Sequence, residues 1–550
     1  MPSISRGATT FADLVKRESA GVRRRIITTS AISGFANAAI LAIINVAAQS
    51  AAYGTTSLRY FLMFVIAMVL YIVCLRVSSR EMSRVMVDVV HRIRVRVADK
   101  VQASELLVLE HIGKSRIINA VTQEATIIAG SGGNIISGLQ ASIVVFFASF
   151  YIAWLSLPAF FLTLLTAVAG IVIVQQSRAL SRRWLKATKS KEVDFLNYTT
   201  HAIEGFKETK INARRRADLR ADLHQSSAEI TELRLKTENL MTGNTIIAQS
   251  AFYVLIASVV FVLPRLIPTY TDVIIEITTA ILFIIGPLRL IIGLVPYFVM
   301  CDEATRAIVS LEEALDEHHP DANGLAPPTG LPAPARFDTL ALRDVTFAYN
   351  ADNGESFAIG PISLEVRAGE IVFIIGGNGS GKSTLLKVLA GLYPPDAGHL
   401  LVDGEPVTDA DLQRYRELFA AIFADFHLFE RLYGLFGSDE RLMTDLLADM
   451  QLSDKVRVEQ DRWSTLDLST GQRKRLALVV SLLDRKPLLV FDELAADQDP
   501  EFRQFLYEVL LPRLRDQGTT IIAATHDDRY FHVADRVIKM EYGKASYVES

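Results

Sequence analysis

The chain has 550 residues, half of them hydrophobic, and a formal net charge of −4. This length exceeds that of one ordinary domain, and the nearly balanced charge gives no reason to expect a nucleic-acid partner. The two cysteines, Cys74 and Cys301, lie in or just past apolar runs, which excludes a disulfide scaffold and fits a reducing compartment.

Residues 1–25 are polar and basic. They are too many for a typical signal-peptide n-region, and the apolar run after them is too long for an h-region. We therefore expect a retained cytoplasmic N-terminal segment. Within it, "TTFADLVKRES" is compatible with an amphipathic helix on the membrane surface and equally with a disordered tail.

Long apolar runs dominate residues 26–315. A helix that crosses a bilayer needs about 20 mostly apolar residues. Six stretches meet this requirement approximately: 26–48, 58–76, 135–155, 159–176, 246–267 and 273–298. The third and fourth are joined by "LSLPA", a tight turn. Six such runs do not occur together in soluble folds, so we predict a six-helix α transmembrane domain rather than buried core helices.

The distribution of Lys and Arg predicts the orientation of these spans. Cations are concentrated before the first span, after the second and after the fourth, whereas the other three loops carry few. Under the positive-inside rule, both termini are cytoplasmic. The two long cation-rich segments have helical periodicity and return to the membrane. We expect helical hairpins that turn within "SELLVLEHIGKSRI" and "EGFKETKIN", either contacting a partner domain or simply solvated.

Arg289 falls well inside the sixth predicted span. A charge there costs at least about 2.5–3.5 kcal/mol on insertion scales, so it should face a wet cavity or a partner. Contact with an anionic substrate is one interpretation, and snorkelling or an intramolecular ion pair is the other. Residues 316–338, which follow the spans, are rich in Pro and Gly and predict a semi-extended linker. We expect a soluble α/β domain over residues 339–550.

The stretch "IVFIIGGNGSGKSTLLKVLAGL" reads as an apolar strand, a glycine-rich turn and a helix. It fits the phosphate-loop pattern G-x-x-x-x-G-K-[ST], in which backbone N–H groups converge on phosphate oxygens at a helix N-terminus. Lys382 should reach the β- and γ-phosphates, and the Ser383 hydroxyl should bind Mg²⁺. The predicted nucleotide-binding residues here are Gly376, Gly377, Asn378, Gly379, Ser380, Gly381, Lys382, Ser383 and Thr384.

A buried parallel strand, "PLLVFDE", ends in two carboxylates. We expect Asp492 to hold Mg²⁺ and Glu493 to act as general base on the attacking water. Upstream, "LDLSTGQRKRLALVVSLL" starts a helix at which Ser469, Gly471 and Gln472 offer a hydroxyl, backbone amides and a side-chain amide to a γ-phosphate. A phosphate loop together with this carboxylate strand predicts ATP hydrolysis.

At this point the sequence resembles the ABC transporter ATPases, whose signature is commonly LSGGQ where this chain has LSTGQ. The resemblance implies head-to-tail dimers in which the signature of one subunit closes the ATP of the other. It also implies that Tyr349, in "VTFAYN", stacks on adenine and that His526, in "AATHDDRY", contacts the γ-phosphate. The segment "AADQD", residues 495–499, occupies the position of the D-loop.

Six spans and one ATPase on a single chain resemble an ABC exporter half-transporter, which implies a homodimer in the bacterial inner membrane. Three phrases, "FADFHLF", "LSTGQRKRLAL" and "DELAADQDPEFRQFLYEVLLP", resemble the cyclic peptide exporters of the pyoverdine and syringomycin type. The implied function is ATP-driven export of a cyclic or modified peptide, such as a siderophore precursor or a lipopeptide. The alternatives are a lipid or lipopeptide flippase, a general efflux transporter and, more remotely, an ABC ATPase acting on nucleic acid.

One departure from the ABC pattern lies in "AAIFADFHLFE". Ala424 stands where these ATPases usually have a glutamine that links the ATP site to the membrane domain. Alanine has no group to reach Mg²⁺ or water, and we expect the neighbouring Asp425 to supply a carboxylate to the metal in part. The remaining catalytic residues Lys382, Glu493 and His526 are present, so ATP hydrolysis should persist.

Overall fold

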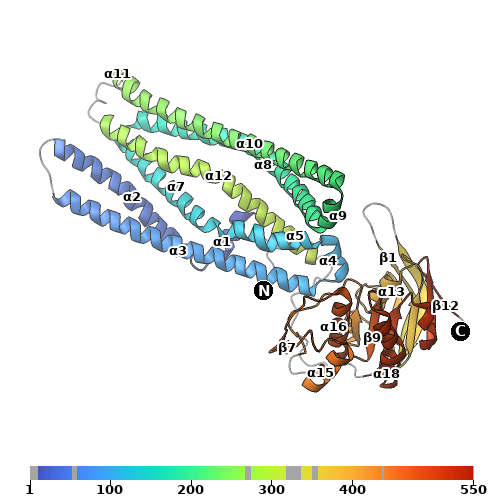
Figure 1. Cartoon of the computed structure of the whole chain (residues 1–550). Coiled ribbons are helices and arrows are strands. Elements are labelled where there is room, and N and C mark those ends of the chain that lie inside the picture. The colour runs from blue at the N-terminus through green and yellow to red at the C-terminus, as the bar shows by residue number, and fades with distance from the viewer. Residues whose placement is uncertain are drawn as a thin grey trace. The chain divides into compact units, whose positions relative to one another are not determined.

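The computed structural model describes residues 10–52, 58–266, 274–316, 336–349, 357–435 and 439–548. The chain forms two compact units (Figure 1). The first comprises Met1–Ser104 and His111–Ala322, and the second comprises Glu105–Glu110 and Asn323–Ser550. Most of the predicted linker and residues 1–9 of the predicted N-terminal segment lie outside the described residues.

The described part of the first unit is helical, and several of its long helices run side by side (Figure 1). Its elements, with α4 running on from the second unit, are α1 (Phe11–Glu18), α2 (Arg23–Ala52), α3 (Leu58–Ala103), α4 (Leu106–Ile112), α5 (Lys114–Asn119), η2 (Ala120–Glu124), α6 (Ala125–Ala129), α7 (Ser131–Leu155), α8 (Leu157–Glu204), α9 (Phe206–Ile211), α10 (Ala213–Ala257), η3 (Ser258–Val262), α11 (Leu263–Leu266) and α12 (Ile274–Asp316). Here η2 and η3 are single π-helical segments within longer helical runs.

Among the described residues, five helical runs are long and apolar enough to cross a membrane. They are Arg23–Ala48, Leu58–Ala103, Lys114–Leu155, Ala213–Arg265 and Ile274–Asp316. The fourth predicted span lies on α8, where the apolar stretch found among the described residues is Leu157–Gly170. The predicted turn before it is confirmed, because the Ser156 side chain caps the start of α8. By length and composition these helices support the predicted transmembrane domain, whereas a count of six spans remains a prediction.

The helices α3 and α8 are 46 and 48 residues long, well beyond what a bilayer requires. Both predicted turn regions contain breaks between helices. One break falls between α3 and α4, and the other encloses the short helix α9. At the second, the Asn212 side chain accepts hydrogen bonds from the backbone N–H groups of Arg214 and Arg215, which caps α10. The prediction of helical hairpins is confirmed.

The N-terminal stretch "TTFADLVKRES" forms the helix α1, capped by Thr10. Its apolar side chains Phe11 and Leu14 are buried, and the Phe11 ring lies 6.3 Å from that of Phe298 on α12. The Phe11 backbone N–H also donates to Asp302 at 2.9 Å. The segment is therefore helical and its apolar face packs on α12, whereas a position on the membrane surface remains a prediction.

The second unit contains two main sheets and a small hairpin. Its strands are β1 (Thr339–Ala348), β2 (Ala358–Arg367), β3 (Ile371–Ile375), β4 (Ala397–Val402), β5 (Glu405–Pro406), β6 (Phe419–Ile422), β7 (Val458–Glu459), β8 (Arg462–Trp463), β9 (Leu488–Asp492), β10 (Thr520–Ala524), β11 (Arg536–Glu541) and β12 (Lys544–Val548). One sheet is antiparallel, in the order β2-β1-β4-β5. The other has the order β12-β11-β3-β10-β9-β6 and is parallel except at β12.

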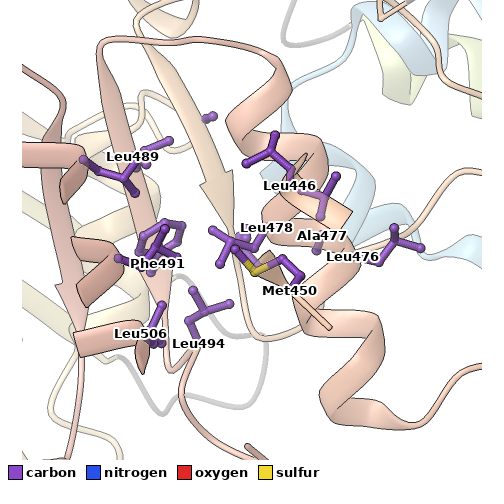
Figure 2. Close-up of a cluster of buried hydrophobic side chains, with 14 of the residues drawn as sticks. Leu446, Met450, Leu476, Ala477, Leu478, Leu489, Phe491, Leu494 and Leu506 are labelled. Carbon is purple, nitrogen blue, oxygen red and sulfur yellow. The ribbon is translucent and has the colours of Figure 1, made fainter. Parts of the chain in front are cut away.

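Helices pack beside these sheets (Figure 1). They are α13 (Lys382–Leu389), α14 (Leu412–Arg416), α15 (Glu440–Asp449), α16 (Thr470–Leu483), α17 (Pro500–Gln504), η6 (Phe505–Leu510), α18 (Leu511–Asp516) and η7 (Asp528–Val533). Figure 2 shows one core, in which Leu478 of α16 and Phe491 of β9 lie among leucines from α15 and η6. Burial of this apolar surface, at about 25 cal/mol per Å², fixes α16 against the strand that carries the predicted carboxylates.

Candidate functional site

The phosphate loop joins β3 to α13 and requires glycine at two crowded positions. At Gly376, where φ is 151°, an added Cβ would lie 2.2 Å from the Met540 carbonyl oxygen. At Gly381, where φ is 103°, it would lie 2.7 Å from the Ile359 side chain. Both conformations are rarely adopted by residues with a side chain. The loop is therefore held in one shape at the start of α13, as its sequence predicts.

Lys382 is only 5% exposed, and its ammonium donates to the carbonyl oxygens of Gly376 and Gly377 at 3.1 and 3.2 Å. This places a positive charge at the loop. A surface cavity of about 460 Å³ opens over it, lined by Phe357, residues 378–384 and Glu493. The structure thus brings most predicted nucleotide-binding residues and two predicted catalytic residues, Lys382 and Glu493, to a single cavity.

The two carboxylates and the histidine meet because β9 and β10 are parallel neighbours with Asp492 paired to Ala524. The carboxyl ends of adjacent parallel strands share one edge of a sheet. The Glu493 backbone N–H donates to the Ala524 carbonyl at 3.1 Å, and His526 Nε2 lies 3.1 Å from Glu493 Oε1. Both side chains remain partly exposed, at 39% for Glu493 and 44% for His526. They are accessible to a water molecule and a phosphate.

Asp492 is 3% exposed, and its Oδ1 atom is buried without a hydrogen-bond partner among the described residues. Such an orphaned carboxylate oxygen suits a ligand from outside the chain. The Ser383 hydroxyl and the Ala424 backbone amide face the same carboxylate. Because Mg²⁺ prefers oxygen ligands and usually takes one or two from protein together with substrate phosphates, Asp492 and Ser383 fit this ion.

Burial raises the pKa of Asp492 above its ordinary 3.8, and the Glu493 charge adds to the effect, while the Ser383 hydroxyl, the Ala424 amide and Lys382 oppose it. A carboxyl group with a raised pKa takes up its proton earlier as the pH falls, and the protonated form does not bind Mg²⁺. We therefore expect the Mg²⁺ concentration for half-maximal ATPase activity to rise as the pH falls from neutral towards this raised pKa. Asp492→Asn should weaken Mg²⁺ binding, and so raise the half-maximal Mg²⁺ concentration, at every pH and should abolish the trend with pH. A half-maximal Mg²⁺ concentration of the wild type that does not change with pH would contradict the assignment.

The structure places Ala424 at the predicted position beside the metal site. Its contribution there is the backbone amide that faces Asp492, because the side chain is a methyl group. The Asp425 side chain is exposed to solvent. Whether Asp425 contributes a metal ligand remains a prediction.

Two aromatic residues stand at the edge where adenine is expected. The register that pairs Ala348 with Ala358 sets Tyr349 opposite Phe357, and the Tyr349 N–H donates to the Phe357 carbonyl at 2.9 Å. The Tyr349 hydroxyl lies 3.2 Å from that of Tyr393, a fully buried residue. Phe357, not Tyr349, is among the residues that line the cavity. Sequence reasoning missed Phe357, although its place across the hairpin from Tyr349 is a usable signal.

We expect Phe357→Ala to raise the KM for ATP about 5- to 100-fold, because stacking of a base on an aromatic ring contributes about 1–3 kcal/mol. The kcat should change little, since stacking on the base acts on nucleotide binding and Phe357 carries no group that takes part in the chemical step. Steady-state ATPase kinetics would measure both values. Phe357→Tyr, which keeps the ring, is the matched control, and an unchanged KM in Phe357→Ala would contradict a role for Phe357 in nucleotide binding.

The signature segment begins α16. Ser469 is its N-cap: the Ser469 hydroxyl accepts from the Gln472 N–H at 3.3 Å, and the Gln472 side chain accepts from the Ser469 N–H at 3.1 Å. An added Cβ at Gly471 would lie 2.7 Å from the Asp497 carbonyl oxygen. Thr470, which replaces the usual glycine, is exposed. The three predicted residues Ser469, Gly471 and Gln472 are not among those lining the cavity over the phosphate loop.

In the first unit, the Arg289 side chain is exposed on α12. Its role as a substrate contact remains a prediction.

The fold and the site define an ATP-hydrolysing membrane transporter. Residues 359–496 match the family described as ABC transporter, and residues 26–288 match the family described as ABC transporter transmembrane region. The chain belongs to the ABC transporters, and within them it is an exporter half-transporter that couples ATP hydrolysis to transport.

A full-length relative supports this assignment. The ATP-binding protein SyrD of Pseudomonas syringae pv. syringae is 32% identical over 529 residues, covering 94% of this chain and 92% of that protein. The ATP-dependent lipid A-core flippase of Chromobacterium violaceum is 31% identical over 38% of each chain. A solved bacterial Atm1-family ABC exporter with ATP bound has the same fold, with a TM-score of 0.72 at 18% identity over 96% of this chain and 95% of that one.

Proposed function

We propose that this ABC exporter moves a cyclic or modified peptide, such as a siderophore precursor or a lipopeptide, across the bacterial inner membrane with both termini in the cytoplasm. The observation that carries the proposal is the match to SyrD along nearly the whole chain, membrane region included. The three phrases that resemble cyclic peptide exporters, all in the ATPase, support it. The cation-rich segments after the second and fourth predicted spans support the orientation.

In the proposed mechanism, Lys382 and the amides of the phosphate loop bind the β- and γ-phosphates. Glu493 Oε1 accepts the proton of the attacking water, and His526, which lies 3.1 Å from that oxygen, orients the base and contacts the γ-phosphate. Asp492 and Ser383 would hold Mg²⁺, which when bound neutralises charge on the phosphates. The resemblance to ABC ATPases implies that the Ser469 segment of a second copy closes the site, and in its own chain that segment is not among the residues that line the cavity. The functional state is therefore a homodimer.

A second candidate is a lipid or lipopeptide flippase. The match to the lipid A-core flippase favours it, although that match covers only 38% of this chain. A flippase and a peptide exporter would share the same ATP site. Only an assay that identifies the transported molecule can therefore distinguish the two functions.

The test uses the purified full-length protein in proteoliposomes, with ATP supplied to the outward-facing ATPase. Peptide export predicts ATP-dependent uptake of a cyclic lipopeptide, ATPase stimulation by that peptide, and no ATP-dependent redistribution of fluorescent phospholipid. Glu493→Gln protein is the matched control and should show no uptake. Phospholipid translocation without peptide uptake would favour the flippase, and neither activity across a panel of cyclic peptides would contradict the peptide proposal.

A further inference from the structure

The α16 helix carries a lysine that is buried beneath the signature segment. Lys474 is 7% exposed. A buried ammonium without partners costs several kcal/mol, so its contacts matter. Its Nζ atom donates to the carbonyl oxygens of Glu493 and Ala496 at 3.2 and 3.0 Å, and to Asp497 Oδ2 at 3.1 Å. The three protons of the ammonium thus meet three acceptors, all in the turn that follows β9.

This turn has an unusual backbone. Glu493 and Asp497 adopt φ values of 53° and 66°, in the left-handed region that residues with a side chain seldom occupy. Such a backbone is unfavourable for a residue with a side chain, so surrounding contacts must hold the conformation. The bond from Lys474 to the Glu493 carbonyl is one of them. Because the carboxylate of Glu493 projects from this backbone, the same bond sets where the predicted base lies relative to the cavity.

A second buried side chain, the amide of Gln498, joins the same two segments. Gln498 is 6% exposed, and its Nε2 donates to the Gly471 carbonyl at 3.0 Å while its Oε1 accepts from Arg475 Nε at 2.9 Å. Arg475 also pairs with Asp499. The start of α16 and residues 493–499 are therefore joined through buried polar side chains, and a buried network whose groups are satisfied is rigid.

We propose that Lys474 is a positioning residue for Glu493, connecting the signature segment to the base that serves the nucleotide of its own subunit. When the signature segment binds the nucleotide of the neighbouring subunit and the start of α16 moves, the backbone of Glu493 then moves with it. In a head-to-tail dimer, each base would be set by how its own signature engages the other ATP. The inference rests on the proposed role of Glu493 and on the proposed dimer.

The test is Lys474→Met in the full-length protein, which keeps the apolar stem and removes the ammonium. We expect kcat for ATP to fall about 10-fold or more with KM within about twofold, because a misplaced base affects the chemical step and not nucleotide binding. Lys486→Met, the same change at a lysine that pairs with Glu417, is the matched control and should leave both values unchanged. If Lys474→Met does not fold, Lys474→Gln, which retains a donor, should show the same split more weakly.

A double variant separates positioning from a general structural effect. In Glu493→Gln, the base is already absent, so adding Lys474→Met should lower the single-turnover rate no further. The proposal would be overturned if the double variant lost the product of the two single-variant rate factors, or if Lys474→Met changed KM and kcat equally. If Glu493→Gln itself kept wild-type turnover, the assignment of the base would fail instead. If that variant lost turnover while the Lys474 variants kept it, only the link through Lys474 would be wrong.

Discussion

Glu493→Gln should abolish steady-state ATP turnover while the protein still binds ATP. General-base catalysis contributes about 10²–10⁴-fold, and the amide of glutamine cannot accept the proton of water at neutral pH. The change preserves the shape of the side chain and a hydrogen-bonding partner for His526, which lies 3.1 Å away. Phosphate release and equilibrium binding of a fluorescent ATP analogue would measure the two properties.

Glu508→Gln is a suitable control, because Glu508 lies on η6 and bonds only to the neighbouring Gln504 among its described side-chain contacts. It should retain turnover. Loss of nucleotide binding in Glu493→Gln would show that the carboxylate acts in the ground state. Unchanged turnover would exclude it as the base.

Lys382→Met should weaken ATP binding about 10- to 100-fold and reduce turnover accordingly, because a hydrogen bond to a charged group contributes about 1.5–3 kcal/mol. Two effects act together: the phosphates lose their cation, and the carbonyl oxygens of Gly376 and Gly377 lose their donor. Nucleotide titration by calorimetry would measure the affinity, and thermal unfolding would show whether the loop still folds.

Lys455→Met, at an exposed lysine of the same unit, controls for the loss of one positive charge. It should bind ATP as the wild type does. A Lys382→Met protein that is folded and binds ATP normally would contradict the interpretation of the phosphate loop. Such a result would also remove the strongest link between this cavity and nucleotides.

The phosphate loop could be predicted because its determinants are local. A strand, crowded glycines and a helix start follow one another in the sequence, and Gly376 and Gly381 have the positive φ values that such a loop requires. The proximity of Glu493 and His526 needed one further step, namely that their strands are parallel neighbours. The resemblance to ABC ATPases implies instead that His526 contacts the γ-phosphate, and so predicts this proximity without the strand pairing.

Other features depend on packing between distant segments and carry no local pattern. Lys474 reads as a surface cation in "GQRKR", yet it is buried because the turn after β9 offers it three acceptors. Phe357 acquires its place only through the pairing of β1 with β2.

The contact at Gly471 bears on how this signature can change. The Asp497 carbonyl oxygen would lie 2.7 Å from any Cβ at Gly471, and backbone cannot yield as a flexible side chain does. Thr470 projects into solvent at the first helical position, where no described contact requires a glycine. Within one subunit, a side chain is therefore excluded at residue 471 and accommodated at residue 470. The two middle letters of the motif are under unequal steric constraint, and the threonine of LSTGQ stands at the less crowded one.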